Sequence, residues 1–266
     1  MEEIKMLSPS RINVWFKCPR LYYYRYILGI PTEPSIHLYK GSLVHSIIEN
    51  VFKNNKWVDI KKHASQALKK EWKPSNDRVI LTELEDKQHY KDTEAILKSF
   101  GTMFQAKIDI VLQDERIRDK NHAWNTLKPR LSEHEISNDE LQLKGIIDSI
   151  ETDFDGRTFI IDYKTSKKYQ NMVSEEYVRQ LSIYALLYAE NNKKLPDYVG
   201  INYLRYGEVY MFPVTQTMID QTKQLVQNIQ NKITSTNIDD YPLIGDKYAV
   251  EECKQIQKRL DINLTL

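Results

Sequence analysis

The sequence predicts a mixed α/β or α+β domain in which helices flank a small mixed sheet. Helical patterning dominates residues 1–130, two β-rich segments begin near Leu131, and a second hairpin pattern lies between further helices. This order of helices, hairpin, helix, hairpin and helices is typical of a small sheet covered by helices. We expect N-terminal helices of the domain over 1–55, a helical insertion or arm over 56–130, and the core sheet with C-terminal helices over 131–266.

The N-terminal region is expected to contain three helices. Ser8 followed by proline is typical of a helix N-cap with proline at the first helical position, so the first helix should run to Lys17. A second helix should begin at Pro19, and the segment 31–34 should be a loop because it is bounded by prolines. Apolar residues at helical spacing predict a third helix over 42–53.

Turn signals organise the second half of the chain. Two β-rich segments flank Asp155-Gly156, and two more flank Gly207. Between and after these hairpins, apolar residues recur at helical spacing. The expected elements, in order, are strands 141–151 and 158–165, helix 175–190, strands 199–206 and 208–214, and helices 217–234 and 247–260.

Composition excludes several classes of protein. The chain has 266 residues, of which 41% are hydrophobic and 28% charged, as expected for a soluble globular protein rather than a disordered one. No apolar run is long enough to cross a bilayer, and the N-terminus lacks a secretory signal. Two cysteines fit a reducing compartment, so we expect a cytoplasmic protein with no membrane partner.

The net charge of +1 hides an uneven distribution along the chain. Lysine and arginine exceed aspartate and glutamate over residues 1–73, whereas acidic residues are in excess over the remainder. A basic region beside an acidic one suits a nuclease, which needs cations for phosphates and carboxylates for metal. Charge alone, however, is explained equally well by an ordinary solvated surface.

The first hairpin carries the charged residues of greatest interest. Asp162 and Lys164 are two apart on one expected strand and therefore point to one face, and Asp148 lies on the preceding strand. A two-residue loop would place Asp148 opposite Tyr163. A three-residue loop ending with Gly156 in the left-handed conformation would instead place Asp148 opposite Asp162. In that case two carboxylates and one ammonium group lie close together.

Such a cluster has a chemical use. Adjacent carboxylates repel each other, and a hard divalent cation such as Mg²⁺ relieves the repulsion while activating a water for phosphodiester cleavage. Lys164 would stabilise the transition state or help to deprotonate that water. The alternative is a cross-strand salt bridge on a solvated face. Ile146, Ile147, Ile160 and Ile161 favour a buried strand, on which charges require a function.

Five short blocks follow one another between about residues 7 and 190. They are LSPSRINVWFKCPRLYYYRYILGI, GSLVHSIIE, GIIDSIE, IIDYKTSK and QLSIY. Each is weak alone, but the ordered set resembles the RecB-like branch of the PD-(D/E)XK nuclease superfamily. The resemblance implies a restriction-endonuclease-like core that carries a helical insertion.

The resemblance also implies a Mg²⁺ or Mn²⁺ cofactor and a role for individual residues. Without it, His45 would be read as an ordinary surface or core histidine, and Tyr184 as core. Glu135 is a candidate outer acid, although surface charge explains it more simply. The implied roles are metal ligation by the carboxylates of Asp148 and Asp162, the backbone carbonyl of Tyr163 and the imidazole of His45, catalysis by Lys164, and orientation of the site or the DNA strand by Gln180 and Tyr184.

Basic and aromatic residues alternate in the second expected helix. Arg20 and Arg25 lie among the tyrosines of residues 22–26, and such a pattern suits phosphate contact combined with base stacking. We therefore expect Arg20 or Arg25 to contact DNA. Core packing is the alternative for at least half of the tyrosines, because several share a helix face.

The C-terminus departs from the family pattern. Many RecB-like nucleases, including the AddB type and the CRISPR-associated exonucleases, end with further cysteines that bind a [4Fe–4S] cluster. Such a cluster needs four thiolates, whereas this chain has only Cys18 and Cys253, so no iron–sulfur cluster is expected. We predict instead that the tail helix packs on the helix at 18–26 through apolar residues, namely Tyr248, Val250, Ile256 and Leu260.

The sequence therefore favours a metal-dependent DNA nuclease. We expect exonuclease character on single strands or duplex ends, in DNA repair, recombination or mobile-element processing, with a helicase or repair protein as a partner. One alternative is a non-catalytic DNA-binding subunit of a larger complex, against which the intact Asp148, Asp162 and Lys164 argue. The other is a structural domain whose hairpin charges form a salt bridge.

Overall fold

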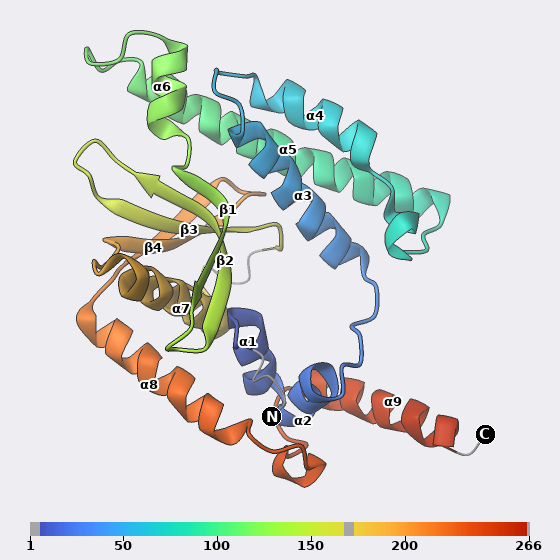
Figure 1. The fold of residues 1–266 in the computed structure, drawn as a ribbon. Coiled ribbons are helices and arrows are strands. Elements are labelled where there is room, and N and C mark those ends of the chain that lie inside the picture. Colours follow the sequence, from blue (N-terminus) through green and yellow to red (C-terminus); the bar gives the residue numbers. More distant parts are fainter. Residues whose placement is uncertain (1–5, 168–172, 265–266) are drawn as a thin grey trace.

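A five-stranded mixed sheet forms the centre of the computed structural model, which describes residues 6–167 and 173–264 (Figure 1). The strands lie in the order β1-β2-β3-β4-β5, and only β3 and β4 are parallel to each other. Helices cover both faces, which confirms the predicted fold class. The strands are β1 (Leu131–Asn138), β2 (Leu143–Thr152), β3 (Thr158–Lys164), β4 (Tyr198–Tyr203) and β5 (Glu208–Pro213).

The helices begin at side chains that suit helix N-termini. Ser8, Thr82 and Ser174 each accept a hydrogen bond from a backbone N–H of the first turn, which satisfies a donor that the helix leaves unpaired. Among the described residues the helices are α1 (Pro9–Lys17), α2 (Pro19–Tyr22), α3 (Ile36–Phe52), α4 (Ile60–Glu71), α5 (Glu83–Val111), α6 (Lys120–Leu127), α7 (Glu175–Asn192), α8 (Gln216–Lys232) and α9 (Lys247–Leu264), with short π or 3₁₀ segments at Tyr23–Ile27, Pro74–Asp77 and Ile238–Asp240.

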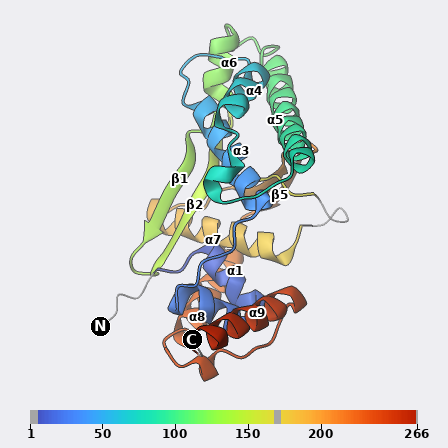
Figure 2. The ribbon, with the colours of Figure 1, turned by 90° about the vertical axis from the view of Figure 1, so that its right-hand side faces the viewer.

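Two hydrophobic cores lie on opposite faces of the sheet. The first core joins the sheet to α1, α2, α7, α8 and α9, and the second joins it to α3, α4, α5 and α6. Figure 2 shows α4, α5 and α6 at one end of the molecule and α8 and α9 at the other. Neighbouring residues of β3 contribute to different cores, since Ile160 belongs to the first and Ile161 to the second.

The helical arm of residues 56–130 lies between α3 and β1 in the chain. It contains α4, α5 and α6, which pack with α3 around Phe52, Phe100 and Trp124. We retain as a proposal that this arm is an insertion into the domain. In the residues that the structure describes, no helix is both long and apolar enough to span a membrane.

The hairpin between β2 and β3 has the three-residue loop rather than the two-residue one. Ser149 pairs with Ile161 and Thr152 with Thr158. Gly156 has a φ of 77°, in the left-handed region that glycine adopts without strain. This register is the one that sets Asp148 opposite Asp162.

Strand β1 was not predicted, and the sequence-based boundaries of two helices were wrong. Along β1 only Ile136 is buried, because β1 lies at the sheet edge, so the apolar alternation that marks a strand is missing. Helix α3 begins at Ile36, six residues earlier than expected, because Ser35 caps it. The expected second helix is α-helical only over Pro19–Tyr22 and continues as a π-helical turn.

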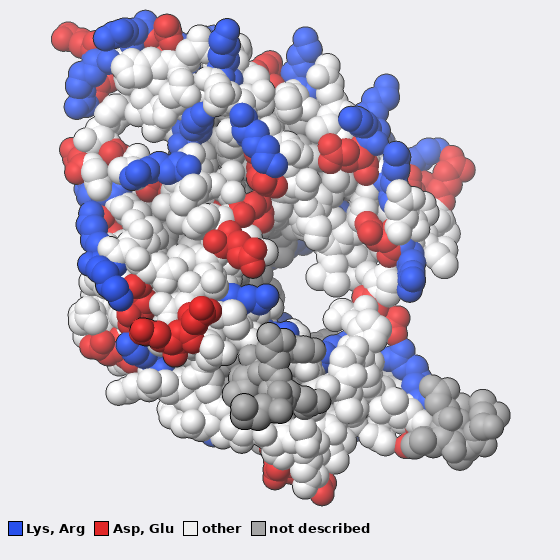
Figure 3. Space-filling view, viewed as in Figure 1, with Lys and Arg blue, Asp and Glu red and all other residues white. Residues whose placement is uncertain are grey.

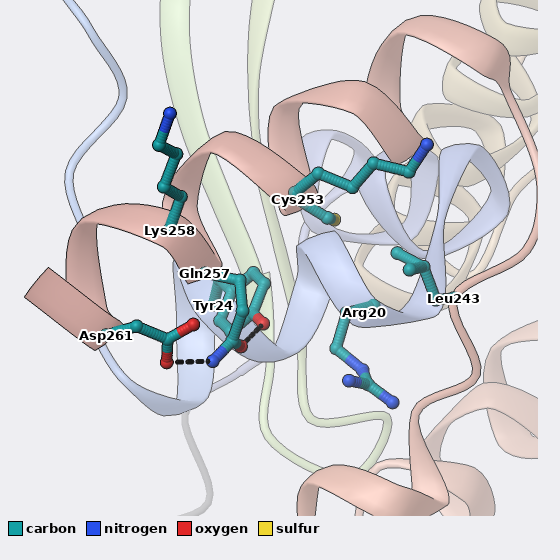
Figure 4. Close-up of a pocket in the computed structure, with 8 residues that line it drawn as sticks. Arg20, Tyr24, Leu243, Cys253, Gln257, Lys258 and Asp261 are labelled. Atoms are coloured by element: carbon teal, nitrogen blue, oxygen red, sulfur yellow. Dashed lines mark hydrogen bonds between the residues drawn. The ribbon is translucent and has the colours of Figure 1, made fainter.

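The tail helix α9 packs against α2, as predicted. Cys18 Sγ lies 3.8 Å from Cys253 Sγ, and both thiols are buried. Figure 4 shows the Tyr24 hydroxyl beside Gln257, to whose Oε1 it donates at 2.6 Å. Ile256 is also buried, but the prediction for Tyr248 was wrong. Its side chain is 83% exposed because it lies on the outer face of the helix.

Candidate active site

The candidate site begins where β2 and β3 diverge. The paired ladder ends at Ser149 and Ile161. Beyond this point the Tyr163 backbone N–H donates to Asp148 Oδ2 at 2.6 Å, so a side-chain carboxylate replaces the next strand carbonyl. Asp148 and Asp162 are 7% and 2% exposed. Both carboxylates therefore lie deep in the structure, where a charge needs compensation.

His45 approaches the carboxylates from α3. Its Nδ1 lies 3.2 Å from Asp148 Oδ1 and 3.1 Å from Glu133 Oε1, and its Nε2 lies 3.0 Å from the Tyr163 carbonyl oxygen. The imidazole thus contacts two carboxylates and one backbone carbonyl at the point where β2 and β3 separate. His45 therefore lies beside Asp148, and the Tyr163 carbonyl oxygen lies beside His45. Metal ligation by these groups stays a prediction.

Sequence reasoning missed Glu133. This residue lies on β1 between the pairs Ser132–Ser149 and His134–Ile147, and it has a φ of 46° although it is not glycine. Strained backbone of this kind is concentrated at functional sites. The sequence suggested Glu135 instead, but Glu135 is exposed and lines a neighbouring cavity. No sequence signal identified Glu133, because β1 was not recognised as a strand.

A second group of polar side chains surrounds Asp162 on the α7 side. Lys164 Nζ lies 2.7 Å from Asp162 Oδ2 and donates to Gln180 Oε1 at 3.0 Å. The Gln180 amide donates to Asp162 Oδ1 and to the Tyr184 hydroxyl oxygen, both at 2.9 Å. Lys164 Nζ also lies 4.5 Å from the centre of the Tyr177 ring. These contacts fix the ammonium group beside the carboxylate.

Burial and charge shift the ionisation of these groups. Burial, together with the negative charge of Asp148, raises the pKa of Asp162 to about 6 even though Lys164 acts in the opposite direction. Burial lowers the pKa of Lys164, but the Asp162 carboxylate outweighs it, so this pKa is raised. The Asp148–Asp162 repulsion is therefore only partly neutralised by the protein itself.

The donor set fits a hard divalent cation. One ligand atom each from His45, Glu133 and Asp148 lies within 4.8 Å of the others. Carboxylate and carbonyl oxygens suit Mg²⁺ and Mn²⁺, and imidazole suits transition metals. The side chains of His45 and Glu133 are 24% and 25% exposed, so this cluster is open to solvent on one side.

We expect the metal-free protein to lose stability as the pH rises through the titration of His45. Burial lowers the pKa of His45, but the hydrogen bonds to Asp148 and Glu133 outweigh it and raise the pKa to about 10, above its ordinary value of 6.5. The resulting stabilisation is complete below pH 6.5 and disappears as the pH approaches 10. With EDTA present, the difference in melting temperature between wild type and His45→Gln should shrink over this range. A difference that does not change with pH would contradict the prediction.

Gly145 allows Tyr184 to approach β2 closely. A Cβ at Gly145 would lie 3.0 Å from Tyr184 Cε1, closer than side chains normally pack. We expect Gly145→Ala to displace the ring and loosen the Tyr184–Gln180 hydrogen bond. Cleavage should fall by roughly tenfold, since small misplacements of positioning groups are costly. Tyr184→Phe is the variant to compare with it, because it keeps the ring and removes only the hydroxyl. Both variants should be assayed below their melting temperatures. Wild-type turnover in Gly145→Ala would show that the ring adapts.

Arg20 and Arg25 lie outside this cluster. Arg25 is 7% exposed at its side chain and pairs with Glu252 of α9, and it also donates to the carbonyls of Ile30 and Pro31. Arg20 donates to the Tyr241 carbonyl at 2.6 Å and lines an open pocket of about 650 Å³ against α9 (Figure 4). The structure therefore ties Arg25 to the tail, whereas Arg20 faces a pocket. Contact of either residue with DNA stays a proposal.

Charge is mixed on the face that carries the arm. Figure 3 shows basic and acidic side chains side by side over the arm, and acidic side chains gathered near the middle of this face. The same view shows a hollow between the arm and the C-terminal helix. On this face, the uneven charge of the sequence does not produce one basic surface.

The chain is similar to one protein family, to longer helicase/deoxyribonuclease subunits and to a solved structure. The profile of the PD-(D/E)XK nuclease superfamily matches residues 6–258. A subunit of the ATP-dependent helicase/deoxyribonuclease of Streptococcus agalactiae is 23% identical over 212 residues, covering 76% of this chain and 18% of that protein. The corresponding protein of Streptococcus mutans is 22% identical over 269 residues, covering 97% and 23%. The chain thus spans less than a quarter of these relatives.

The solved structure is from Eubacterium rectale and is described as that of a candidate exonuclease. It aligns with a TM-score of 0.47 and 13% sequence identity, covering 87% of this chain and 81% of that chain.

Proposed function

The chain belongs to the PD-(D/E)XK nuclease superfamily, and we propose that it is a Mg²⁺- or Mn²⁺-dependent deoxyribonuclease that hydrolyses phosphodiester bonds. We further propose an exonuclease that prefers single strands or duplex ends. Its biological setting would be DNA repair, recombination or the processing of mobile elements.

One observation carries this proposal. Asp148, Asp162 and Lys164 are charged residues of a buried hairpin. Asp148 contacts His45 from α3, and Asp162 contacts Lys164. Both carboxylates are buried. Burial, together with the negative charge of Asp148, raises the pKa of Asp162 to about 6 although Lys164 lies beside it. Such an arrangement is expected where a cation has to bind.

Each residue has a proposed task. His45, Glu133, Asp148, Asp162 and the Tyr163 carbonyl would hold the cation. When bound, the cation supplies Lewis-acid stabilisation of the phosphate and an acidified water. Lys164, held by Asp162 and Gln180, would place its positive charge where the phosphate oxygens gain negative charge.

Digestion of labelled DNA tests the proposal. Single- and double-stranded substrates labelled at the 5′ or the 3′ end should be shortened with Mg²⁺ or Mn²⁺ and left intact with EDTA. The order of products reveals polarity and distinguishes exonuclease from endonuclease action. The same cations should raise the melting temperature of wild type but not of Asp148→Asn, because a ligand of the folded state stabilises it by mass action. DNA left intact under all conditions would exclude the activity.

The relatives support a proposal about a partner protein. The two streptococcal relatives are helicase/deoxyribonuclease subunits several times longer than this chain. We propose that this chain acts with an ATP-dependent helicase, which would supply the unpaired strand to its site. Stimulation of strand degradation by ATP hydrolysis in a reconstituted mixture would support this, and degradation unaffected by the helicase would oppose it.

A further inference from the structure

A second cavity adjoins the candidate active site. It has a volume of about 310 Å³ and lies between the start of α1, the two strands β1 and β2, and α7. Gln180 and Tyr184, which form part of the site, also form a wall of this cavity. The cavity therefore shares two residues with the cluster around Asp162 and Lys164.

The N-terminal segment is fixed beside β2 by the sheet itself. Leu7 forms a parallel bridge with Leu143, and the Lys144 N–H donates to the Leu7 carbonyl at 2.9 Å. This pairing uses the edge of β2 that becomes available where β3 diverges. Ser8 and Ser10 follow Leu7 closely in the chain, and both line the same cavity as Lys144.

The polar groups of the cavity suit a phosphate. Lys144 is exposed, and its ammonium group has no ion-pair partner within residues 6–167 and 173–264. Ser8 Oγ and Ser10 Oγ lie 3.0 Å apart and hydrogen-bond to each other, and Ser8 Oγ also accepts from the Arg11 N–H. One hydroxyl hydrogen of the pair is therefore left to donate to a ligand. An ammonium group and hydroxyls are common partners of nucleic-acid phosphates.

The remaining walls suit a sugar or a base. Ile146 is 52% exposed, unusual for a large apolar side chain on a largely buried strand, and Tyr184 also lines the cavity. Glu135 adds one carboxylate, which disfavours a second phosphate and can accept a hydrogen bond from a base amino group. The volume is at the lower end of ligand pockets, so it admits one nucleotide rather than a base pair.

We propose that this cavity binds the nucleotide next to the scissile phosphate of a single strand. Lys144, Ser8 and Ser10 bind its phosphate, and Ile146 contacts its sugar or base. The proposal rests on the proposed nuclease function and makes it more specific. A duplex has to open by at least one pair before its end can enter, so an unpaired end is the substrate.

Affinity for a labelled oligonucleotide tests the proposal. A fluorescein-labelled single strand of about 20 nucleotides is titrated with the Asp162→Asn protein and Mn²⁺, so that the probe is not cut. Adding Lys144→Ala should weaken binding about fivefold or more. The slope of log affinity against log salt should become less steep by about 0.7, the value for one phosphate contact on a single strand. Ser10→Ala should weaken binding less. A blunt duplex should bind more weakly than the single strand.

Lys254→Ala is the matched control, because Lys254 is an exposed lysine that lines the other pocket, against α2. It should leave both the affinity and the salt slope unchanged. Equal losses in the Lys144 and Lys254 variants would overturn the subsite, as would an unchanged salt slope in Lys144→Ala or equal binding of the blunt duplex. Wild-type cleavage of DNA alongside any of these results would leave the nuclease proposal standing. Absence of cleavage by wild type would remove the nuclease proposal itself.

Discussion

Lys164→Ala is expected to lower DNA cleavage at least about a hundredfold while the protein remains folded. Removing one preorganised group that stabilises transition-state charge typically costs that much. The side chain of Lys164 is 18% exposed and contacts the side chains of Asp162 and Gln180. Its loss removes no backbone hydrogen bond, and Gln180 still donates to Asp162 Oδ1. Initial rates with Mg²⁺ or Mn²⁺, normalised to folded protein by circular dichroism, provide the measurement.

Asp148→Asn and Asp162→Asn should have effects of similar size, because each removes a proposed cation ligand. Their combination with Lys164→Ala should be far from additive, since the three residues act on the same step. Lys254→Ala, on the distant face of α9, should retain wild-type rates. Cleavage retained by any purified and folded single variant would place that residue outside the catalytic site.

Gly245→Ala is expected to destabilise the fold strongly and to release the C-terminal helix. Gly245 has a φ of 123°, and a Cβ there would overlap the Lys17 carbonyl oxygen. The neighbouring Asp246 N–H donates to that same oxygen at 2.8 Å, so the two backbones cannot separate without losing this bond. Backbone strain of about 1–3 kcal/mol is then added to the clash. Undocking of α9 would expose Cys253 and Ile256.

Chemical and thermal unfolding measure this effect, with Gly156→Ala as the control. Gly156 also has a positive φ, 77°, but a Cβ there meets nothing within 4 Å. Its substitution should cost only about 1 kcal/mol, the usual penalty of a left-handed alanine. If the two variants unfold alike, the close approach at Lys17 does not hold the tail.

The central hairpin could be predicted because its information is local. Asp155-Gly156 identifies the turn, and the isoleucines on either side identify buried strands. Pairing then depends on loop length, and the sequence left a two-residue and a three-residue loop open. The register of the structure decides for the three-residue loop. His45 was placed only through the resemblance, because a contact between α3 and β2 is not encoded in the spacing of either segment.

Other parts depend on tertiary context that no local pattern contains. Strand β1 is held by pairing with β2 rather than by its own apolar residues, so Glu133 remained hidden with it. The role of Lys144 depends on Leu7, which joins β2 from the far end of the chain. From the sequence, the tyrosines of residues 22–26 could stack on bases or pack in the core. The structure buries Tyr22, Tyr23 and Tyr24 in the core.

The position of the candidate site between the two cores affects when activity can appear. His45 belongs to the α3 side, in the core shared with the arm, whereas Gln180 comes from α7 in the other core. Neither core alone contains the full set of groups. If the chain cuts DNA as proposed, a nascent, misfolded or proteolysed copy that has completed only one core is inactive. In that case the fold would limit cleavage to molecules in which both cores are complete.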